Sequence, residues 1–233
     1  MNLPDFYNPV GYSIVKREWL LRQFPGVGEV QVNFSQLHQD MFVLSMLDGK
    51  RDGAYLEIGA HEPVFISNTY LLESVFGWKG VGIELDAQMV ERHRGLRRNA
   101  CHREDALAVD YARLLQSAGL PPVVDYLSID VDPPAVTLAA LKRIPHDAYK
   151  FRVITFEHDY TAGGAAERME SRAYLGSLGY QLVVSDVSWK DWIVEDWWVH
   201  PDLVDGAIAA ALTCDDEAHH EHDKYIYGGY AAR

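Results

Sequence analysis

The sequence predicts a doubly wound α/β fold, with a mainly parallel sheet and an antiparallel hairpin towards its C-terminal end. Short apolar runs alternate with helical stretches from Ala54 onward, and several of these runs end at glycine or acidic residues. Two further apolar runs, at 180–187 and 191–199, follow one another with no helix between them. Alternating strands and helices form βαβ crossovers, which give a parallel sheet with helices on both faces.

The first half of the chain contains an extension, a helix and two strand–helix pairs. Residues 1–33 mix aromatic residues, proline and glycine, which predicts an irregular extension with a short helical stretch at 15–23. Apolar residues within 34–49 have helical spacing and Gly49 suits a helix stop, so we expect an amphipathic helix lying against the sheet. The elements expected next are a strand at 54–60, a helix at 67–76, a strand at 80–85 and a helix at 87–98.

The second half continues the alternation and then closes with the hairpin. Pro121-Pro122 leads into the most apolar strand, and Pro133-Pro134 is expected to give that strand an extended exit. The expected elements are strands at 101–107, 123–131 and 151–158, helices at 110–118, 138–144 and 165–178, the hairpin, and a helix at 202–212. We expect three parts, namely the extension 1–33, a catalytic domain 34–212 and a polar, peripheral tail 213–233.

Composition excludes several classes of protein. The chain has 233 residues with 21 Lys and Arg against 34 Asp and Glu, a net charge of −13, which argues against a general nucleic-acid binder. The two cysteines, Cys101 and Cys214, lack the spacing of a zinc site or a disulfide scaffold. No signal peptide and no apolar run of about 20 residues is visible, so we expect a soluble, cytoplasmic protein without a membrane partner. Homo-oligomerisation stays open.

Acidic residues at the first two strand ends predict a nucleoside-type cofactor. Ligands of parallel sheets bind beyond the carboxyl ends of the strands. Glu57 and Gly59 end the first strand, but the loop has a single glycine, and no GK[ST] motif follows. Glu84 lies 25 residues after Gly59, a spacing suited to a carboxylate that accepts hydrogen bonds from a ribose diol. Asp105, followed by Ala106, could accept from an adenine amine or be a solvated loop residue.

A second acidic group follows the next two strands. Asp130 and Asp132 end the most apolar strand, and Glu157, His158 and Asp159 end its expected neighbour. Oxygen-rich clusters of this kind bind Mg²⁺ or Mn²⁺, here through Asp130, Glu157 and Asp159. Proton abstraction by Glu157 or His158, and a hydrogen-bonded network that holds the strand ends, are alternative interpretations.

Three other groups of residues allow both a functional and a structural interpretation. The histidines of the tail could bind a metal or be solvated. The tryptophans of the hairpin could line an acceptor pocket or form core. A cluster of arginines could attract an anion or form a solvated helix face. These groups are His219, His220 and His222; Trp189, Trp192, Trp197 and Trp198; and Arg92, Arg94, Arg97, Arg98 and Arg103.

Residues 34–160 resemble FkbM-type S-adenosylmethionine-dependent methyltransferases, which have the Rossmann-like class I fold. The motifs that carry the resemblance are Gln39-Asp40, Gly49-Lys50, the Glu-Ile-Gly-Ala turn at 57–60, Ser67-Asn68-Thr69, Phe76-Gly77-Trp78 and Gly82-Ile83-Glu84, with the later strands DYLSIDVD and ITFEHD. By this resemblance Glu57, Gly59 and Ala60 approach the methionine part of the cofactor, Asn68 and Thr69 support that loop, Glu84 holds the ribose, and Asp105 and Ala106 flank the adenine.

The resemblance implies methyl transfer from S-adenosylmethionine, most readily to a hydroxyl group of a small molecule or a saccharide. Asp130 and His158 are the expected proton-accepting residues, with a divalent cation as a candidate second cofactor. Asp132-Pro133 stands where the family often has Glu-Gly, at the place where an acceptor would bind. A NAD-dependent oxidoreductase and a non-catalytic cofactor-binding or assembly protein are the alternatives.

Overall fold

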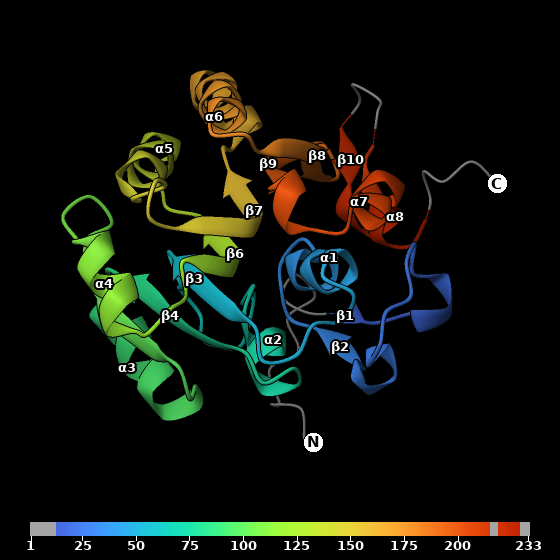
Figure 1. Ribbon diagram of the computed structural model, residues 1–233, viewed down its shortest axis with the longest axis horizontal. Coiled ribbons are helices and arrows are strands. Elements are labelled where there is room, and N and C mark those ends of the chain that lie inside the picture. The colour runs from blue at the N-terminus through green and yellow to red at the C-terminus, as the bar shows by residue number, and fades with distance from the viewer. Residues whose placement is uncertain (1–12, 215–218, 229–233) are drawn as a thin grey trace.

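The computed structural model describes residues 13–214 and 219–228, and one eight-stranded sheet runs through its centre (Figure 1). The strands of this sheet are β3 (Ala54–Ile58), β4 (Lys79–Glu84), β5 (Ala100–Arg103), β6 (Val123–Ile129), β7 (Lys150–Glu157), β8 (Gln181–Trp189), β9 (Trp192–Val199) and β10 (His220–Glu221). Their order is β10-β8-β9-β7-β6-β3-β4-β5. Strands β3 to β7 pair in parallel, whereas β9 runs antiparallel to both β7 and β8. The predicted fold class is therefore confirmed.

Helices cover both faces of the sheet. They are α1 (Gln39–Met46), α2 (Tyr70–Ser74), α3 (Ala87–Leu96), α4 (Tyr111–Ser117), α5 (Pro134–Arg143), α6 (Ala165–Ser177), α7 (Gly206–Leu212) and α8 (His222–Ile226). Short 3-10 turns are η1 (Arg17–Trp19), η2 (Val27–Glu29), η3 (Tyr160–Ala162) and η4 (Pro201–Leu203). Apolar residues of α4, α5 and α6 pack on one face and those of α1, α2 and α7 on the other, so the sheet separates two apolar cores (Figure 1).

The N-terminal segment is more closely packed than an irregular extension would be. Strands β1 (Ser13–Ile14) and β2 (Val32–Asn33) pair antiparallel, and the 3-10 turn η1 replaces the helical stretch expected at 15–23. Phe24 and Val30 are 4% and 0% exposed and belong to the same core as α1. The segment therefore covers α1 and contributes to the core.

Helix α1 differs from the amphipathic helix that the spacing predicts. All eight of its residues are buried, including Asp40. The Asp40 carboxylate accepts hydrogen bonds from the Phe34 N–H at 2.8 Å and the Ser35 hydroxyl at 2.7 Å, which satisfies it inside the protein. Phe42 stacks on Trp197 of β9, with ring centroids 4.5 Å apart. The helix has no solvent face because other segments cover the side that the sheet leaves free.

Two further expectations are wrong for the described residues. Pro133 is extended as expected, but Pro134 does not continue the extended exit and instead opens α5, where its missing N–H costs no hydrogen bond. The tail is not peripheral over 219–228, because β10 pairs with β8 and Tyr225 is 2% exposed. Residues 215–218 and 229–233 of that tail lie outside the described part of the chain. Within 13–214 and 219–228, no helix is both long and apolar enough to cross a membrane.

Candidate functional site

A cavity of about 440 Å³ opens at the carboxyl ends of the parallel strands. Strands β3 and β6 are neighbours there, yet the chain leaves β3 towards β4 and reaches β6 later, so the strand order reverses between them. Ligands of open α/β sheets bind at such a point. The residues that line the cavity are Gln36, Glu57, Gly59, Ala60, His61, Ile66, Asn68, Glu84, Asp130, Val131, Asp132, Glu157, Asp159, Ala162, Trp192 and Val194.

Gly59 joins the loops that follow β3 and β6. Its φ is +83°, and a Cβ atom at this position would lie 1.8 Å from the carbonyl oxygen of Asp130. Glycine is therefore required both for the backbone conformation and for the close approach. The Gly59 and Ala60 N–H groups both donate to the Ile83 carbonyl at 3.0 Å, which fixes the turn against β4.

Glu57 is held below this turn by a buried network. The Thr69 hydroxyl donates to its carboxylate at 2.8 Å, and Arg97 donates to Thr69 at 2.8 Å. Burial raises the pKa of Glu57 to about 7, although the nearby Arg97 opposes the rise. Arg97 also donates to Glu73, Tyr55 and the Pro63 carbonyl, so one guanidinium orders the whole loop after β3.

Glu84 and Asn68 present polar groups to the same cavity. The Glu84 carboxylate accepts from the His61 N–H at 2.9 Å and the Asp86 N–H at 2.7 Å, which fixes its two oxygens while leaving further lone pairs for a ligand. Asn68 donates through its amide nitrogen to the Ser128 hydroxyl at 2.9 Å. Its amide oxygen is buried and has no hydrogen-bond partner among the described residues.

Asp105 and Ala106 do not reach the cavity. Asp105 is exposed after β5 and accepts a hydrogen bond from the Leu107 N–H at 2.8 Å. Ala106 is 8% exposed and packs in the core beneath α4. The structure thus places the two residues expected to flank an adenine outside the cavity lining.

Three carboxylates meet on the other side of the cavity, and we call them the acidic cluster. Oxygens of Asp132, Glu157 and Asp159 lie within 4.8 Å of one another. Asp130 lines the cavity too, and its carboxyl group lies next to that of Glu157. Burial raises the pKa of Asp130 to about 6, and burial together with the neighbouring Asp130 raises that of Glu157. The sequence predicted a metal site formed by Asp130, Glu157 and Asp159. The structure instead groups Asp132 with Glu157 and Asp159.

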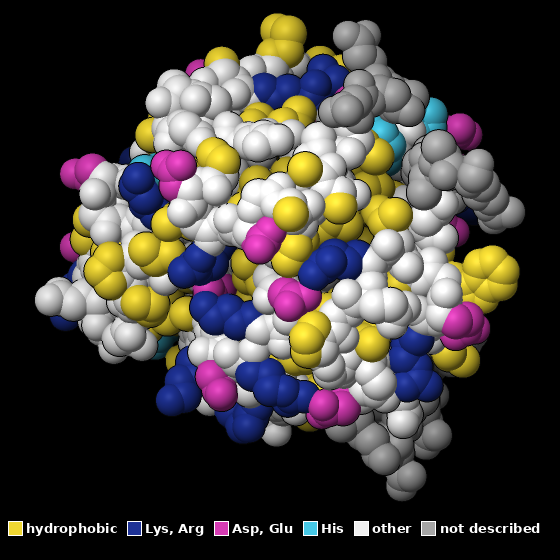
Figure 2. Space-filling model, turned by 45° about the vertical axis from the view of Figure 1, so that its right-hand side comes forward, with side chains coloured by type: hydrophobic (Ala, Val, Ile, Leu, Met, Phe, Trp, Pro, Cys, Tyr) yellow, Lys and Arg dark blue, Asp and Glu magenta, His cyan; other side chains and the backbone are white. Residues whose placement is uncertain are grey.

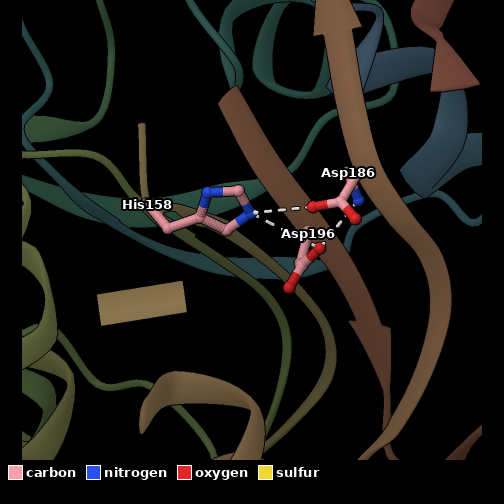
Figure 3. A group of neighbouring side chains, drawn as sticks. All are labelled: His158, Asp186 and Asp196. Carbon is pink, nitrogen blue, oxygen red and sulfur yellow. Dashed lines mark hydrogen bonds and ion pairs between the residues drawn. The ribbon is translucent and has the colours of Figure 1, made fainter. Parts of the chain in front are cut away.

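His158 points away from the cavity although its neighbours in the sequence line it. Its side chain is fully buried, with Nε2 3.5 Å from Asp196 and 3.9 Å from Asp186 (Figure 3). Its Nδ1 accepts a hydrogen bond from the Tyr160 N–H at 3.2 Å. The structure therefore does not bring His158 next to Asp130 as a proton acceptor; we call His158, Asp186 and Asp196 the His158 cluster.

Lys and Arg are absent from the described lining of the cavity, which holds six carboxyl groups and one histidine, His61. On the surface that Figure 2 shows, by contrast, Lys and Arg side chains lie among Asp and Glu side chains. Outside the cavity, the buried carboxylate of Asp125 has two cationic partners, Lys50 at 2.6 Å and Arg152 at 2.9 Å, and that of Asp40 is satisfied by neutral donors. A buried carboxylate without such a partner is unfavourable, so the cavity is suited to a ligand that supplies positive charge or hydrogen-bond donors.

Sequence reasoning missed two contributors to the site. The sequence left Arg97 open between attracting an anion and forming part of a solvated helix face, yet its side chain is 1% exposed, and nothing in the local sequence separates it from the exposed arginines around it. Gln36 lines the cavity from the segment between β2 and α1, outside the central sheet. Of the hairpin tryptophans, Trp192 lines the cavity, whereas Trp197 and Trp198 are core residues.

Comparison with known proteins identifies the fold. No protein-family model matches the chain, and no curated protein matches it. Among solved structures, a protein from Klebsiella pneumoniae assigned as an O-methyltransferase has a TM-score of 0.50 at 17% identity, over 70% of this chain and 79% of that one. A human methyltransferase 10 domain containing protein has a TM-score of 0.50 at 12% identity, over 70% and 80% of the two chains. The fold of this chain is the class I methyltransferase fold.

Proposed function

We propose that the chain is an S-adenosylmethionine-dependent methyltransferase that methylates a hydroxyl group of a small molecule or saccharide. The observation that carries the proposal is the cavity at the reversal of strand order, with Glu57 and Glu84 on one side and the acidic cluster on the other. The FkbM-type motifs of residues 34–160 support it. The single-glycine loop after β3 argues against a dinucleotide cofactor.

The proposed cofactor side uses residues that the fold already fixes. When bound, S-adenosylmethionine supplies an activated methyl group on a positively charged sulfur. Glu84 accepts hydrogen bonds from the ribose diol, and Glu57 with the unpartnered Asn68 oxygen faces the polar methionine part. Gly59 lets the backbone approach the cofactor closely because it carries no side chain.

The acidic cluster is the proposed acceptor side. One of its carboxylates takes the hydroxyl proton while the cavity holds the acceptor oxygen in line with the methyl group. Its three oxygen donors fit a hard divalent cation such as Mg²⁺ or Mn²⁺, and no Lys or Arg among the described residues competes for them. Asp132, Glu157 and Asp159 would hold such an ion, which would lower the pKa of the acceptor hydroxyl.

Titration calorimetry with S-adenosylmethionine and with NAD tests the cofactor. We expect S-adenosylmethionine to bind and Glu84→Ala to weaken its affinity by roughly 10–100-fold, because the variant loses a charged hydrogen-bond acceptor. Glu91→Gln is the matched control, since Glu91 is an exposed acid of α3 that pairs with Arg94 outside the cavity. Binding of NAD in place of S-adenosylmethionine, or equal affinities of wild type and the Glu84 variant, would contradict the proposal.

A further inference from the structure

Trp192 stands out among the tryptophans because it is exposed where a ligand would bind. It is 57% exposed, whereas Trp78, Trp197 and Trp198 are 1%, 0% and 3% exposed. It lines the same cavity as the acidic cluster, at the tip of the hairpin formed by β8 and β9. More than half of the Trp192 surface is therefore open to solvent, as it is for Trp19 at 58%, but of these two tryptophans only Trp192 lines this cavity.

Hydrogen bonds fix the hairpin tip relative to the acidic cluster. The Ile193 N–H donates to the Thr161 hydroxyl at 3.2 Å, and that hydroxyl donates to the Ile193 carbonyl at 3.3 Å. The N–H groups of His158 and Asp159 both donate to the Val194 carbonyl, at 2.9 and 2.8 Å. The backbone that carries Trp192 is therefore tied to the turn that carries Glu157 and Asp159.

The His158 cluster supports this arrangement from below. Arg168 and Arg172 of α6 bond to Asp186 and Asp196, which lie on β8 and β9. His158 accepts the Tyr160 N–H at the start of η3 and lies against both carboxylates. This network joins helix α6, the hairpin and the turn after β7, so the acceptor side of the cavity is preorganised.

An aromatic face beside hydrogen-bond acceptors fits one kind of molecule. The flat, weakly polar indole packs against the C–H face of a ring, and carboxylates accept hydrogen bonds from hydroxyl groups at the ring edge. In the protein without a bound cation, phosphate, sulfate or carboxylate groups on a ligand next to the acidic cluster would be repelled, because six carboxyl groups and no described Lys or Arg line the cavity.

We propose that Trp192 is the acceptor platform and that the methyl acceptor is a saccharide ring without acidic groups, stacked on the indole with hydroxyl groups directed at the acidic cluster. This inference rests on the proposed function, since it names the acceptor of that same cavity. Trp192 is then a specificity-determining residue that contacts the acceptor and leaves the cofactor side unchanged.

The test measures glycan binding and cofactor binding separately. The probes are an array of neutral, sialylated and phosphorylated glycans, applied to protein saturated with S-adenosylhomocysteine, and calorimetry with S-adenosylmethionine. Four proteins are compared, namely wild type, Trp192→Ala, Trp192→Phe and Trp189→Ala. Trp189 is the matched control because it lies opposite Trp192 on the hairpin, is 36% exposed and lines a different cavity.

We expect wild type to bind neutral glycans in preference to acidic ones. Trp192→Ala should lose about tenfold in glycan affinity, the size of one aromatic contact, while Trp192→Phe retains most of it and Trp189→Ala matches wild type. The affinity for S-adenosylmethionine should be the same in all four. If wild type bound neutral glycans through Trp192 but did not bind S-adenosylmethionine, the proposed function would be overturned and the inference about Trp192 would stand.

Three results would overturn the inference itself. If wild type bound S-adenosylmethionine but no neutral glycan, a neutral saccharide would be ruled out as the acceptor. If wild type and Trp192→Ala bound glycans with equal affinity, Trp192 would not be the residue on which the acceptor stacks. An equal loss in Trp189→Ala would show that the hairpin as a whole, and not the indole at the cavity, carries the binding.

Discussion

Two acidic groups flank the same turn and differ in how their charge is balanced. The His158 cluster and the acidic cluster each bring three potential ligand atoms within 4.8 Å of one another. In the first, the carboxylates are buried and pair with Arg172 and Arg168 at 2.7 and 2.5 Å. In the second, the carboxylates have no ion pair with any described Lys or Arg and face a cavity.

The difference teaches that charge compensation, more than acid content, separates supporting structure from a binding site. Burial opposes ionisation of Asp196, yet the hydrogen bonds and charges of Arg172 and His158 together outweigh it and lower the Asp196 pKa to about 2. Burial also raises the pKa of the half-buried Asp159, and no arginine stands beside it to reverse the rise. Compensated carboxylates stabilise the protein, while uncompensated ones store unfavourable energy that a ligand can relieve.

The largest expected effect breaks the compensated group. Asp196→Ala should lower the free energy of unfolding by about 3–5 kcal/mol, because it removes the fully buried partner of Arg172, which keeps only Asp186, and leaves the Asp186 N–H without its acceptor. Urea denaturation of the variant and wild type measures the change. A loss below about 1 kcal/mol would mean that the His158 cluster is not a structural support.

The second prediction applies the same test to the acidic cluster. Asp159 has a φ of +45°, a conformation that asparagine tolerates, so Asp159→Asn removes charge without backbone strain. We expect the free energy of unfolding to stay equal or rise, since repulsion is relieved, while methyl transfer falls by roughly 10²-fold. Unfolding in urea and transfer from labelled S-adenosylmethionine measure the two quantities.

Magnesium provides the control for the same variant. Mg²⁺ should raise the melting temperature of wild type but not of Asp159→Asn, with sodium chloride of equal ionic strength as the reference. If Asp159→Asn destabilised the protein as Asp196→Ala does, the distinction between the two groups would fail.

The smallest expected effect is a difference in pH dependence. Ionised Asp196 stabilises the fold, so its contribution should be full above about pH 4 and be lost as pH falls towards 2. Asp130 has a pKa raised to about 6, so wild type should lose stability relative to Asp130→Asn as pH rises from about 4 through 6. Urea unfolding of wild type, Asp196→Asn and Asp130→Asn across pH gives the two slopes, and slopes of the same sign would contradict the comparison.

Strand positions and the acidic strand ends could be predicted because both follow from local patterns. Each apolar run that ends at Glu57, Glu84, Asp130 or Glu157 became a parallel strand, and parallel strands place their carboxyl ends at one edge. Local pattern does not say what covers an element. The outer side of α1 and the burial of Tyr225 depend on segments far away in the sequence.

The direction in which individual side chains point could not be predicted from the sequence either. His158 lies between two cavity residues, and its rotation into the His158 cluster depends on the turn at Asp159 and on arginines of α6. The sequence around Arg97 does not distinguish it from the exposed arginines nearby. Arg97 is buried because it pairs with the carboxylate of Glu73 on α2. Such choices are made by tertiary contacts.

The close approach of Gly59 to the Asp130 carbonyl couples the loop after β3 to the loop after β6, because even a methyl group at position 59 would push the two loops apart. Directed evolution towards new acceptors should therefore keep residue 59 invariant and diversify the hairpin tip around Trp192, where side chains can change without displacing the neighbouring loops.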